Sequence, residues 1–402
     1  MMESMAIGLQ EPFYSLVADS RWMPSTLMLL TYPFRPDPRV LREARSLHKR
    51  GFDVHLIAWD REGGRPTRAT EHGIDVIRLG PRCIYRSSGK VISRLPRFWV
   101  RALGASKQID FDVVHCHDFD TLPLGLVIGR LRGKPVLYDA HEVYSAMIRK
   151  DVGELSRMVW LSERMLAGWA DEVITVNASL ATMLPSGRRG PPRIVANSPD
   201  PSVLGGRDVK DIRRNHGLEG FVVSYLGSLE PGRFVKEMVE SAGAIPGLTL
   251  AIAGDGTLRP FVEKAAQSNP SVKFLGTLDS DEALRVTWAS DLVIAMLDPS
   301  NPNYKVSTPV KVLDAMACGR PVVLSDGLNI SESVKQIGCG FVISYDKAAF
   351  RAAIEDAKDS QSSLLTEMGR KGREFFDKEL SWQRSESELY KAYEALTISQ
   401  RS

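Results

Sequence analysis

Two side chains with complementary chemistry, Lys311 and Asp314, lie in a segment that the sequence predicts to be a short helix. Thr308 has the side chain of an N-cap, Pro309 suits the first helical position, and Gly319 suits the residue after a helix. Lys311 then falls in the first turn, where the helix dipole disfavours a cation by ~0.3–1 kcal/mol. A bound phosphate would reverse this penalty, and Asp314 could accept hydrogen bonds from hydroxyl groups of the same ligand. The spacing alone also fits a surface helix with a solvated lysine and aspartate.

A second candidate for chemistry is His141, which follows an apolar run from Pro135 to Tyr138. Because an imidazole has a pKa near 6.5, it can orient a hydroxyl group or move a proton at neutral pH. A lone histidine is more often structural, so the residue type alone leaves both roles open.

Aspartate pairs of the D-x-D type hold the metal ion in transferases of a different fold. Three such pairs occur, about as many as chance gives: Asp110/Asp112, Asp118/Asp120 and Asp279/Asp281. Since cationic side chains and a helix N-terminus can stabilise a leaving diphosphate as a metal would, we predict no obligatory metal.

The elements that must position these residues alternate between short apolar runs and amphipathic segments, as in parallel α/β sheets. Strands are predicted at residues 26–31, 53–58, 113–116, 135–138, 172–176 and 193–196, and in a second series at 221–226, 248–253, 272–274, 292–296, 321–324 and 340–343. A linker rich in proline and glycine, residues 185–206, separates the two series. We therefore predict two α/β domains with a cleft between them.

Ligands of such sheets bind beyond the carboxyl ends of the strands, in the turns that lead into helices. The turn after the first strand, residues 32–37, contains no glycine. The G-x-G-x-x-G fingerprint of nicotinamide enzymes is therefore missing, and a dehydrogenase is not expected. Gly254 and Gly256 follow a later strand as a lone G-x-G pair, which is a weak signal.

The composition of the 402 residues is that of globular domains, with 43% hydrophobic and 25% charged side chains. There is no apolar run of ~20 residues that could span a bilayer and no signal-peptide pattern. The four cysteines lie far apart, which favours a reducing cytoplasm over a disulfide framework or a zinc site. The net charge of +3 is too small to indicate nucleic acid as a partner, although residues 1–200 carry +6 and residues 201–402 carry −3.

Residues 76–109 account for the excess of positive charge in the first half. They contain no acidic side chain and eight basic ones: Arg78, Arg82, Arg86, Lys90, Arg94, Arg97, Arg101 and Lys107. Part of the stretch has helical spacing, with Pro96 interrupting it and with Phe98 and Trp99 beside its basic face. This pattern fits either an ordinary helix with a solvated face or a surface for anionic lipid headgroups at the inner face of a membrane.

Five ordered motifs resemble those of glycosyltransferase family 4. Residues 313–323, Leu-Asp-Ala-Met-Ala-Cys-Gly-Arg-Pro-Val-Val, resemble the family signature L-E-A-M-A-x-G-x-P-V-V. Residues 112–117 and 135–142 resemble its D-V-V-H-x-H and P-V-V-x-x-x-H segments. Residues 225–233 resemble its Y-x-G-x-L…R-G turn, and residues 274–276 its F-L-G strand end, so the likeness covers nearly the whole chain.

This resemblance implies the GT-B fold, in which two Rossmann-like parallel-sheet domains face each other across a cleft. The acceptor-side domain would be residues 1–198, with a last helix, residues 380–402, packing back on it. The donor-binding domain would be residues 199–379. The implied activity is the retaining transfer of a sugar, of hexosyl type, from a nucleotide-diphosphate donor to the hydroxyl of a glycan or lipid-linked acceptor.

Most of the donor contacts that the resemblance implies lie in the second domain. Arg233 matches a basic position that contacts the diphosphate, Lys311 would assist it, and Asp314 matches the glutamate that holds the ribose. Arginine suits phosphate because its planar guanidinium can bind two oxygens at once. Close backbone approach or further donor contacts are expected at Gly227, Ser228, Gly256, Gly276, Ser307 and Thr308, with packing as the alternative role of each glycine.

The first domain would contribute the acceptor side. His141 matches the family histidine that lies near the reacting carbon and the acceptor. His117, Asp118 and Glu142 are further candidates for holding the acceptor.

The sequence departs from the usual motif at Val306, where the family has a glutamate that contacts the donor sugar. It instead resembles a variant with a P-x-K-x-x-E core, matched by Pro309, Lys311 and Asp314. The candidates to replace the glutamate are Tyr304, Lys305 and Ser307. Alternatives to transfer are a nucleotide-sugar epimerase or phosphorylase of the same architecture, for which no motif is present, and a donor-binding scaffold without catalysis, which Val306 suggests.

Overall fold

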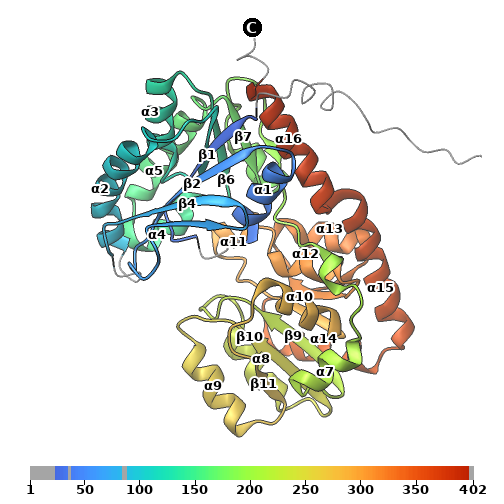
Figure 1. The fold of residues 1–402 in the computed structure, drawn as a ribbon. Coiled ribbons are helices and arrows are strands. Elements are labelled where there is room, and N and C mark those ends of the chain that lie inside the picture. The colour runs from blue at the N-terminus through green and yellow to red at the C-terminus, as the bar shows by residue number, and fades with distance from the viewer. Residues whose placement is uncertain (1–22, 35–37, 84–87, 398–402) are drawn as a thin grey trace, which may run out of the picture. The chain divides into compact units, whose positions relative to one another are not determined.

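The computed structural model describes residues 23–34, 38–83 and 88–397, and its chain divides into two compact units. Unit 1 comprises residues 1–138 and 393–402, and unit 2 comprises residues 139–392. Figure 1 shows the elements of both units with their labels.

Unit 1 is built on a sheet flanked by helices. Its strands are β1 (Ser25–Leu30), β2 (Asp53–Trp59), β3 (Arg68–Glu71), β4 (Ile74–Leu79) and β5 (Val113–His117), and its helices are α1 (Pro38–Lys49), α2 (Ser88–Ser106) and α3 (Leu122–Arg132). The strand β1 pairs in parallel with β2 and β5, β2 pairs in parallel with β4, and β3 is an antiparallel edge strand. The full order of this eight-stranded sheet is β3-β4-β2-β1-β5-β6-β7-β8, and the division between the units falls inside β6 (Val136–Ala140).

Unit 2 contains the rest of the chain. Up to the second sheet it forms α4 (Tyr144–Val152), α5 (Leu155–Ala167), β7 (Glu172–Thr175), α6 (Ala178–Met183), β8 (Arg193–Ile194), a 3₁₀ turn (Pro201–Leu204) and α7 (Val209–His216). The second sheet and its helices are β9 (Phe221–Leu226), α8 (Val235–Ala242), β10 (Leu248–Ala253), α9 (Arg259–Ser268), β11 (Val272–Phe274), α10 (Ser280–Ala289), β12 (Leu292–Ala295), α11 (Pro302–Val306), α12 (Val310–Ala317), β13 (Val322–Ser325), α13 (Asn329–Ile337), β14 (Gly340–Ile343), α14 (Lys347–Asp359) and α15 (Ser362–Phe375). A π-helical turn, Phe376–Leu380, leads into α16 (Trp382–Thr397).

The second sheet is parallel throughout, in the order β11-β10-β9-β12-β13-β14. Both of its faces are covered by helices. Because consecutive strand residues point to opposite sides, each strand contributes to two apolar layers. On β12, Leu292 and Ile294 pack in one apolar layer with Met238 of α8, whereas Val293 packs in the other layer with Met316 of α12. Each of these fully buried aliphatic side chains contributes ~1.5–3 kcal/mol to the core.

The predicted fold class, two parallel α/β sheets, is confirmed, and each predicted strand is present within a few residues of its expected bounds. The prediction missed β3 and β4. The β3 segment reads Arg-Ala-Thr-Glu and forms a half-exposed edge without an apolar run, and in β4 the charged residues Asp75 and Arg78 interrupt the apolar ones. The change from one sheet to the next falls between β8 and β9. The domain bounds at residue 198 stay a prediction.

Tyr393, near the end of α16, belongs to unit 1 and packs within it. Its hydroxyl lies 3.0 Å from Oγ1 of Thr26 and 3.0 Å from Nδ1 of His115, and its ring meets Phe52 edge to face at 5.2 Å. Among the described helices, none combines the length and the apolar character that a membrane crossing requires.

Candidate functional site

In unit 2, the turns that follow β9, β10 and β11 lie next to one another. The backbone N–H of Gly227 donates to the carbonyl of Ala253 at 2.9 Å, and that of Gly254 donates to the carbonyl of Gly276 at 2.8 Å. These bonds place Gly227, Gly254 and Gly276 at one edge of the sheet, at the carboxyl ends of three parallel strands. This is the edge where ligands of open α/β sheets bind.

Two of these turns need glycine, because a side chain at Gly227 or Gly256 would collide with neighbouring atoms. Gly227 has φ +147°, and a Cβ there would lie 2.7 Å from Nζ of Lys311. Gly256 has φ +153°, and its Cβ would lie 2.5 Å from the carbonyl oxygen of Leu229. At Gly227 the absent side chain therefore leaves the space that the lysine head occupies. The second turn is tied to the first, because Glu230 accepts hydrogen bonds from the N–H and the hydroxyl of Thr257 at 2.9 and 2.6 Å.

Lys311 lies at this edge, in the first turn of α12. Its Nζ is 4.5 Å from the ring centroid of Tyr225, over the ring face. Burial and the positive charge of Arg233 lower the pKa of Lys311 from its ordinary 10.5 to about 7, while the charge of Asp314 opposes the shift. The negative charge of Asp314 therefore does not fully balance the positive charge of Lys311 at this position.

Arg233 provides the second cation. Its guanidinium lies 5.2 Å from the ring centroid of Tyr304, and among the described residues its buried Nε has no hydrogen-bond partner. The next residue, Phe234, has the left-handed φ of +59° that a residue with a side chain adopts only at a cost of ~1–2 kcal/mol. Its ring is held by edge-to-face contacts with Tyr345 and Phe350 at 5.0 and 5.3 Å. Core packing thus fixes the turn that carries Arg233.

The start of α12 differs from the prediction. Pro309, with φ −59° and ψ +129°, is the N-cap, the helix begins at Val310, and no side chain caps it. The expectation that Thr308 caps the helix was therefore wrong, because Pro309 stays extended and its carbonyl receives the first bond, from the N–H of Val312 at 2.9 Å. The first N–H groups of α12 thus have no side-chain cap, as an anion site requires.

The end of α12 is as predicted. Gly319 has φ +62° and donates to the carbonyl of Met316 at 3.0 Å, while Arg320 donates to that of Ala315 at 2.8 Å. This pair of bonds is a Schellman motif.

The remaining predicted donor residues lie around this helix. Asp314, one turn after Lys311, is half-buried. Ser228 accepts the hydroxyl proton of Tyr225 on its carbonyl at 2.7 Å, and Ser307 donates to the carbonyl of Tyr304 at 3.1 Å. Thr308 lies at the border of a cavity of about 870 Å³ that runs between α6, α13 and α16.

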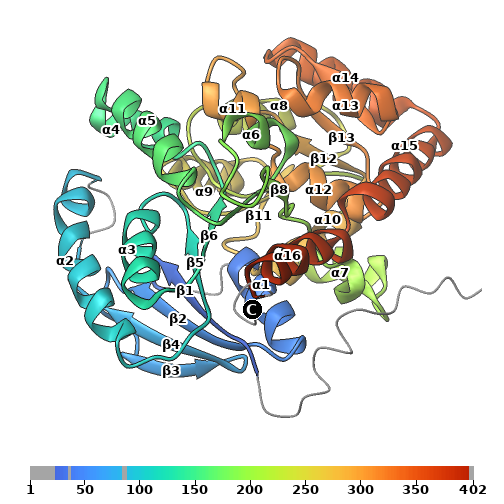
Figure 2. The same ribbon diagram turned by 90° about the horizontal axis from the view of Figure 1, so that it is seen from above.

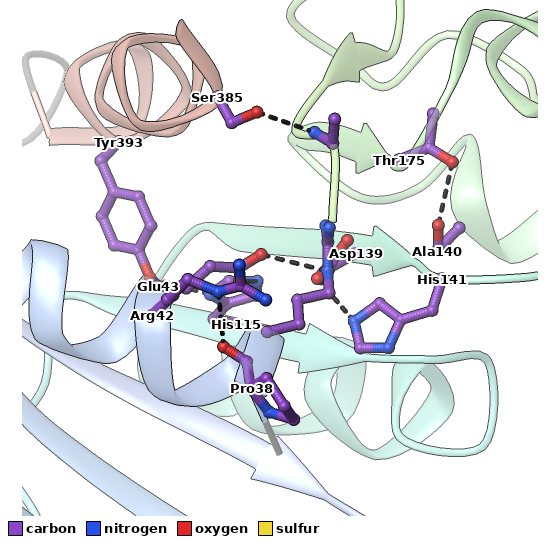
Figure 3. A network of polar contacts seen from close by, with 12 residues as sticks. Pro38, Arg42, Glu43, His115, Asp139, Ala140, His141, Thr175, Ser385 and Tyr393 are labelled. Carbon is purple, nitrogen blue, oxygen red and sulfur yellow. Dashed lines mark hydrogen bonds and ion pairs between the residues drawn. The ribbon is translucent and has the colours of Figure 1, made fainter. Parts of the chain in front are cut away.

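His141 lies in unit 2 as well, directly after β6. Its Nε2 is 2.7 Å from Oδ2 of Asp139, which is fully buried, and Figure 3 shows the imidazole turned toward that carboxylate. The backbone between them is anchored by the hydroxyl of Thr175, which donates to the carbonyl of Ala140 at 2.9 Å. This arrangement fixes the orientation of the imidazole.

Glu142 and Val306 belong to a structural link in unit 2. The Glu142 carboxylate accepts a hydrogen bond from Nδ2 of Asn303 at 3.2 Å, and the Val306 carbonyl accepts one from Nδ2 of Asn177 at 3.3 Å. Both bonds hold α11 in place. Val306, at the position of the family glutamate, thus makes its hydrogen bond to Asn177 through its backbone carbonyl.

His117 and Asp118 lie at the end of β5, in unit 1. The His117 ring is buried and stacked on that of His115 at 4.2 Å, and Nε2 of His115 lies 3.8 Å from the Glu43 carboxylate. Asp118 has φ +63° and accepts on its carbonyl the hydroxyl of Thr121 at 3.0 Å. Their expected acceptor roles stay predictions.

The structure therefore brings Arg233, Lys311 and the glycine turns together within unit 2. Two residues that the sequence did not single out support these side chains: Tyr225 lies beneath Lys311, and Asp139 lies beside His141. Tyr225 lies near the end of a strand that leads into a glycine turn, and this position is a signal for a ligand-facing residue. Asp139 was overlooked as a partner of His141, although residues two apart on a strand share a face.

The basic stretch, residues 76–109, is only partly available as a surface. Arg78 is buried and lies 2.7 Å from Glu71, and Phe98 is buried against the Trp59 ring at 5.3 Å, so neither belongs to an exposed cationic face. The Trp99 indole donates to the Asp120 carbonyl at 2.9 Å. Pro96 lies within the continuous helix α2, and Arg86 lies outside the described residues.

Two family models match the chain. Residues 39–203 match glycosyltransferase family 4, and residues 220–359 match glycosyl transferases group 1. A glycogen synthase of Mycobacterium tuberculosis is 24% identical over 357 residues, which are 86% of this chain and 77% of the relative.

Solved structures show the same fold. The sucrose-phosphate synthase of Thermosynechococcus elongatus has a TM-score of 0.74 at 20% identity, with 94% of this chain and all of that chain covered. HepE of Anabaena, solved with UDP-glucose, has a TM-score of 0.69 at 16% identity, with 92% and 100% covered.

Proposed function

Because the chain belongs to the glycosyltransferases of the family-4 type, with their GT-B fold, we propose that it moves a hexosyl group from a nucleoside-diphosphate sugar to an acceptor hydroxyl with retention. A donor of this kind is supported by HepE, which was solved with UDP-glucose. We propose a glycan or lipid-linked precursor as the acceptor, reached from the cytoplasmic side.

The observation that carries the proposal is the pair of cations at the sheet edge of unit 2. The charge of Arg233 helps to lower the pKa of Lys311 to about 7, so the two positive groups disfavour each other when no anion is bound. A diphosphate would supply the missing negative charge, and the uncapped N–H groups of α12 would add donors. Asp314 is the proposed partner of the ribose hydroxyls.

The same groups serve the reaction. As the bond between the anomeric carbon and the diphosphate oxygen breaks, negative charge grows on the leaving diphosphate, and Arg233 and Lys311 stabilise it. The acceptor oxygen forms the new bond to the anomeric carbon, and its proton passes to the leaving diphosphate. Because the leaving charge is met by side chains, we propose that no metal is required.

His141 is proposed to bind the sugar and the incoming hydroxyl. Its imidazole is held by the buried carboxylate of Asp139 at 2.7 Å, so its orientation is set before the substrate binds. This ordering reduces the entropy that binding would otherwise cost.

An assay of donor hydrolysis and transfer with His141→Ala tests the proposal and separates it from a donor-binding scaffold. We expect the variant to bind the nucleoside diphosphate as the wild type does and to lose turnover by at least about 100-fold. His216→Ala, which alters another carboxylate-paired histidine of unit 2, is the matched control and should retain turnover. A wild type that binds donor without turnover, or a His141→Ala variant with full turnover, contradicts the proposal.

A further inference from the structure

Helix α5 exposes a row of large apolar side chains to solvent. Leu155, Met158, Leu161 and Met165, with Trp169 just beyond the helix, are 54–64% exposed. They recur at steps of three or four residues, so they lie along one face. We call these five residues the α5 stripe, and Figure 2 shows the helix beside α4 in unit 2.

The stripe is not the face with which α5 packs on its own unit. Glu163 and Ala167 are fully buried, and the helical period places them away from the stripe. On the neighbouring helix α4, Met147 is also half-exposed. A contiguous apolar patch of this kind on a soluble domain marks an interaction site.

The charges beside the stripe are mainly positive. Among the described side chains of α4 and α5, Arg149, Arg157 and Arg164 are exposed, and Glu154 at the start of α5 is the exposed acid. The Arg164 guanidinium is held by the carbonyl of Met183 at 3.1 Å and lies 5.7 Å from the Trp160 ring centroid.

Two more exposed cations lie at the Trp169 end of the stripe. The backbone N–H groups of Arg188 and Arg189 donate to the carbonyls of Ala170 and Asp171, each at 2.9 Å, and this fixes their loop beside Trp169. The stripe thus has cations both along it and at its end.

We propose that the α5 stripe is a docking surface for an anionic lipid bilayer. Leucine and methionine would enter the boundary between headgroups and acyl chains, the tryptophan would lie at the headgroup level, and the arginines would bind lipid phosphates. A second copy of the chain is the poorer occupant, because a two-fold contact would bring the same arginine-rich face onto itself. This inference is independent of the proposed catalytic site.

Co-sedimentation of the full chain with vesicles tests the inference. We expect the wild type to bind vesicles containing phosphatidylglycerol at low salt, and to bind phosphatidylcholine vesicles far less. The double variant Met158→Ser/Leu161→Ser should reduce binding at least about tenfold. Arg157→Gln/Arg164→Gln should weaken binding and flatten its salt dependence.

The matched control is Leu364→Ser on α15, an apolar residue that is 45% exposed in the same unit, which should bind as the wild type does. Because the substituted side chains are exposed, the melting temperatures should be unchanged. Failure of the wild type to bind phosphatidylglycerol vesicles at low salt, or equal binding by Met158→Ser/Leu161→Ser, overturns the inference. A dimer that this variant converts to a monomer, without lipid binding, assigns the stripe to a second copy instead.

Discussion

Nε2 of His141 lies 2.7 Å from Oδ2 of Asp139, and this carboxylate is completely buried. The two residues are separated by one position at the end of β6, whose carbonyl at Ala140 is bonded to Thr175. The strand therefore presents the histidine with its orientation already set. Of the candidate catalytic groups in unit 2, this imidazole is the one held by a buried carboxylate.

Asp139→Asn should lower turnover by about tenfold to 100-fold, because a charge-assisted hydrogen bond of ~1.5–3 kcal/mol is lost. Donor affinity should change little, since the cations that we assign to the diphosphate are untouched. Steady-state kinetics over a range of pH, measured together with the melting temperature, distinguish this from a loss of fold. An unchanged kcat with an unchanged profile would rule out the positioning role.

The affinity for a nucleoside diphosphate should fall as the pH rises above about 7. The pKa of Lys311 is lowered to about 7 in the free protein, so above that pH the amine is mostly neutral and must take up a proton to meet the diphosphate. Each further pH unit then weakens binding by up to about tenfold until the pKa of the bound state is reached. Calorimetric titration in buffers of different ionisation enthalpy measures the proton uptake.

Lys311→Arg is the control for this pH dependence. An arginine stays charged over the whole range, so its variant should bind with a flat profile above pH 7. A wild type whose affinity is constant between pH 6 and pH 9 would argue against a direct contact of Lys311 with the diphosphate.

Gly227→Ala should reduce donor affinity and stability together. The added Cβ would lie 2.7 Å from Nζ of Lys311, and the φ of +147° strains any residue with a side chain. We expect a loss of roughly 1–3 kcal/mol in the free energy of unfolding and at least about a tenfold loss in affinity. Gly104→Ala in α2, where a Cβ would meet open space, is the matched control: it should leave the donor affinity unchanged and raise the free energy of unfolding by roughly 0.5–1 kcal/mol.

Chelation should leave turnover unchanged. In the proposed function, Arg233 and Lys311 would provide the positive charge that a metal ion supplies to the leaving diphosphate in other transferases. Initial rates measured after dialysis against EDTA, with and without added magnesium, check this. A rate that disappears on chelation and returns with magnesium would show that the two cations are insufficient.

The sequence was informative where one local signal determines one local structure. The β9 and β10 segments are apolar runs, each with a single serine or threonine (Ser224 and Thr249), and both strands have the predicted bounds. Gly319 followed by Pro321 predicted the end of α12, because few other residues can adopt its left-handed φ. Arg233 was identified through a resemblance, and the structure adds the reason for its position, which is the packing of Phe234.

The sequence was less informative where structure depends on context. Thr308 has the side chain of an N-cap, but the ψ of Pro309 moved the helix start by one residue. Phe98 and Arg78 read as parts of an exposed basic face, although the fold buries both. The α5 stripe carries the periodicity of an ordinary amphipathic helix, and only the structure shows that its apolar face is the exposed one.

Arg233 and Lys311 are proposed to form the diphosphate site, and calorimetric titration of UDP, ADP and GDP measures whether they do. We predict that one of the three binds the wild type, and that Arg233→Ala and Lys311→Ala each weaken this binding about tenfold to 100-fold. Arg351→Ala on α14 is the control and should bind as the wild type does. Wild-type affinity in both site variants, or no binding of any of the three nucleotides, would show that these two residues do not form a diphosphate site.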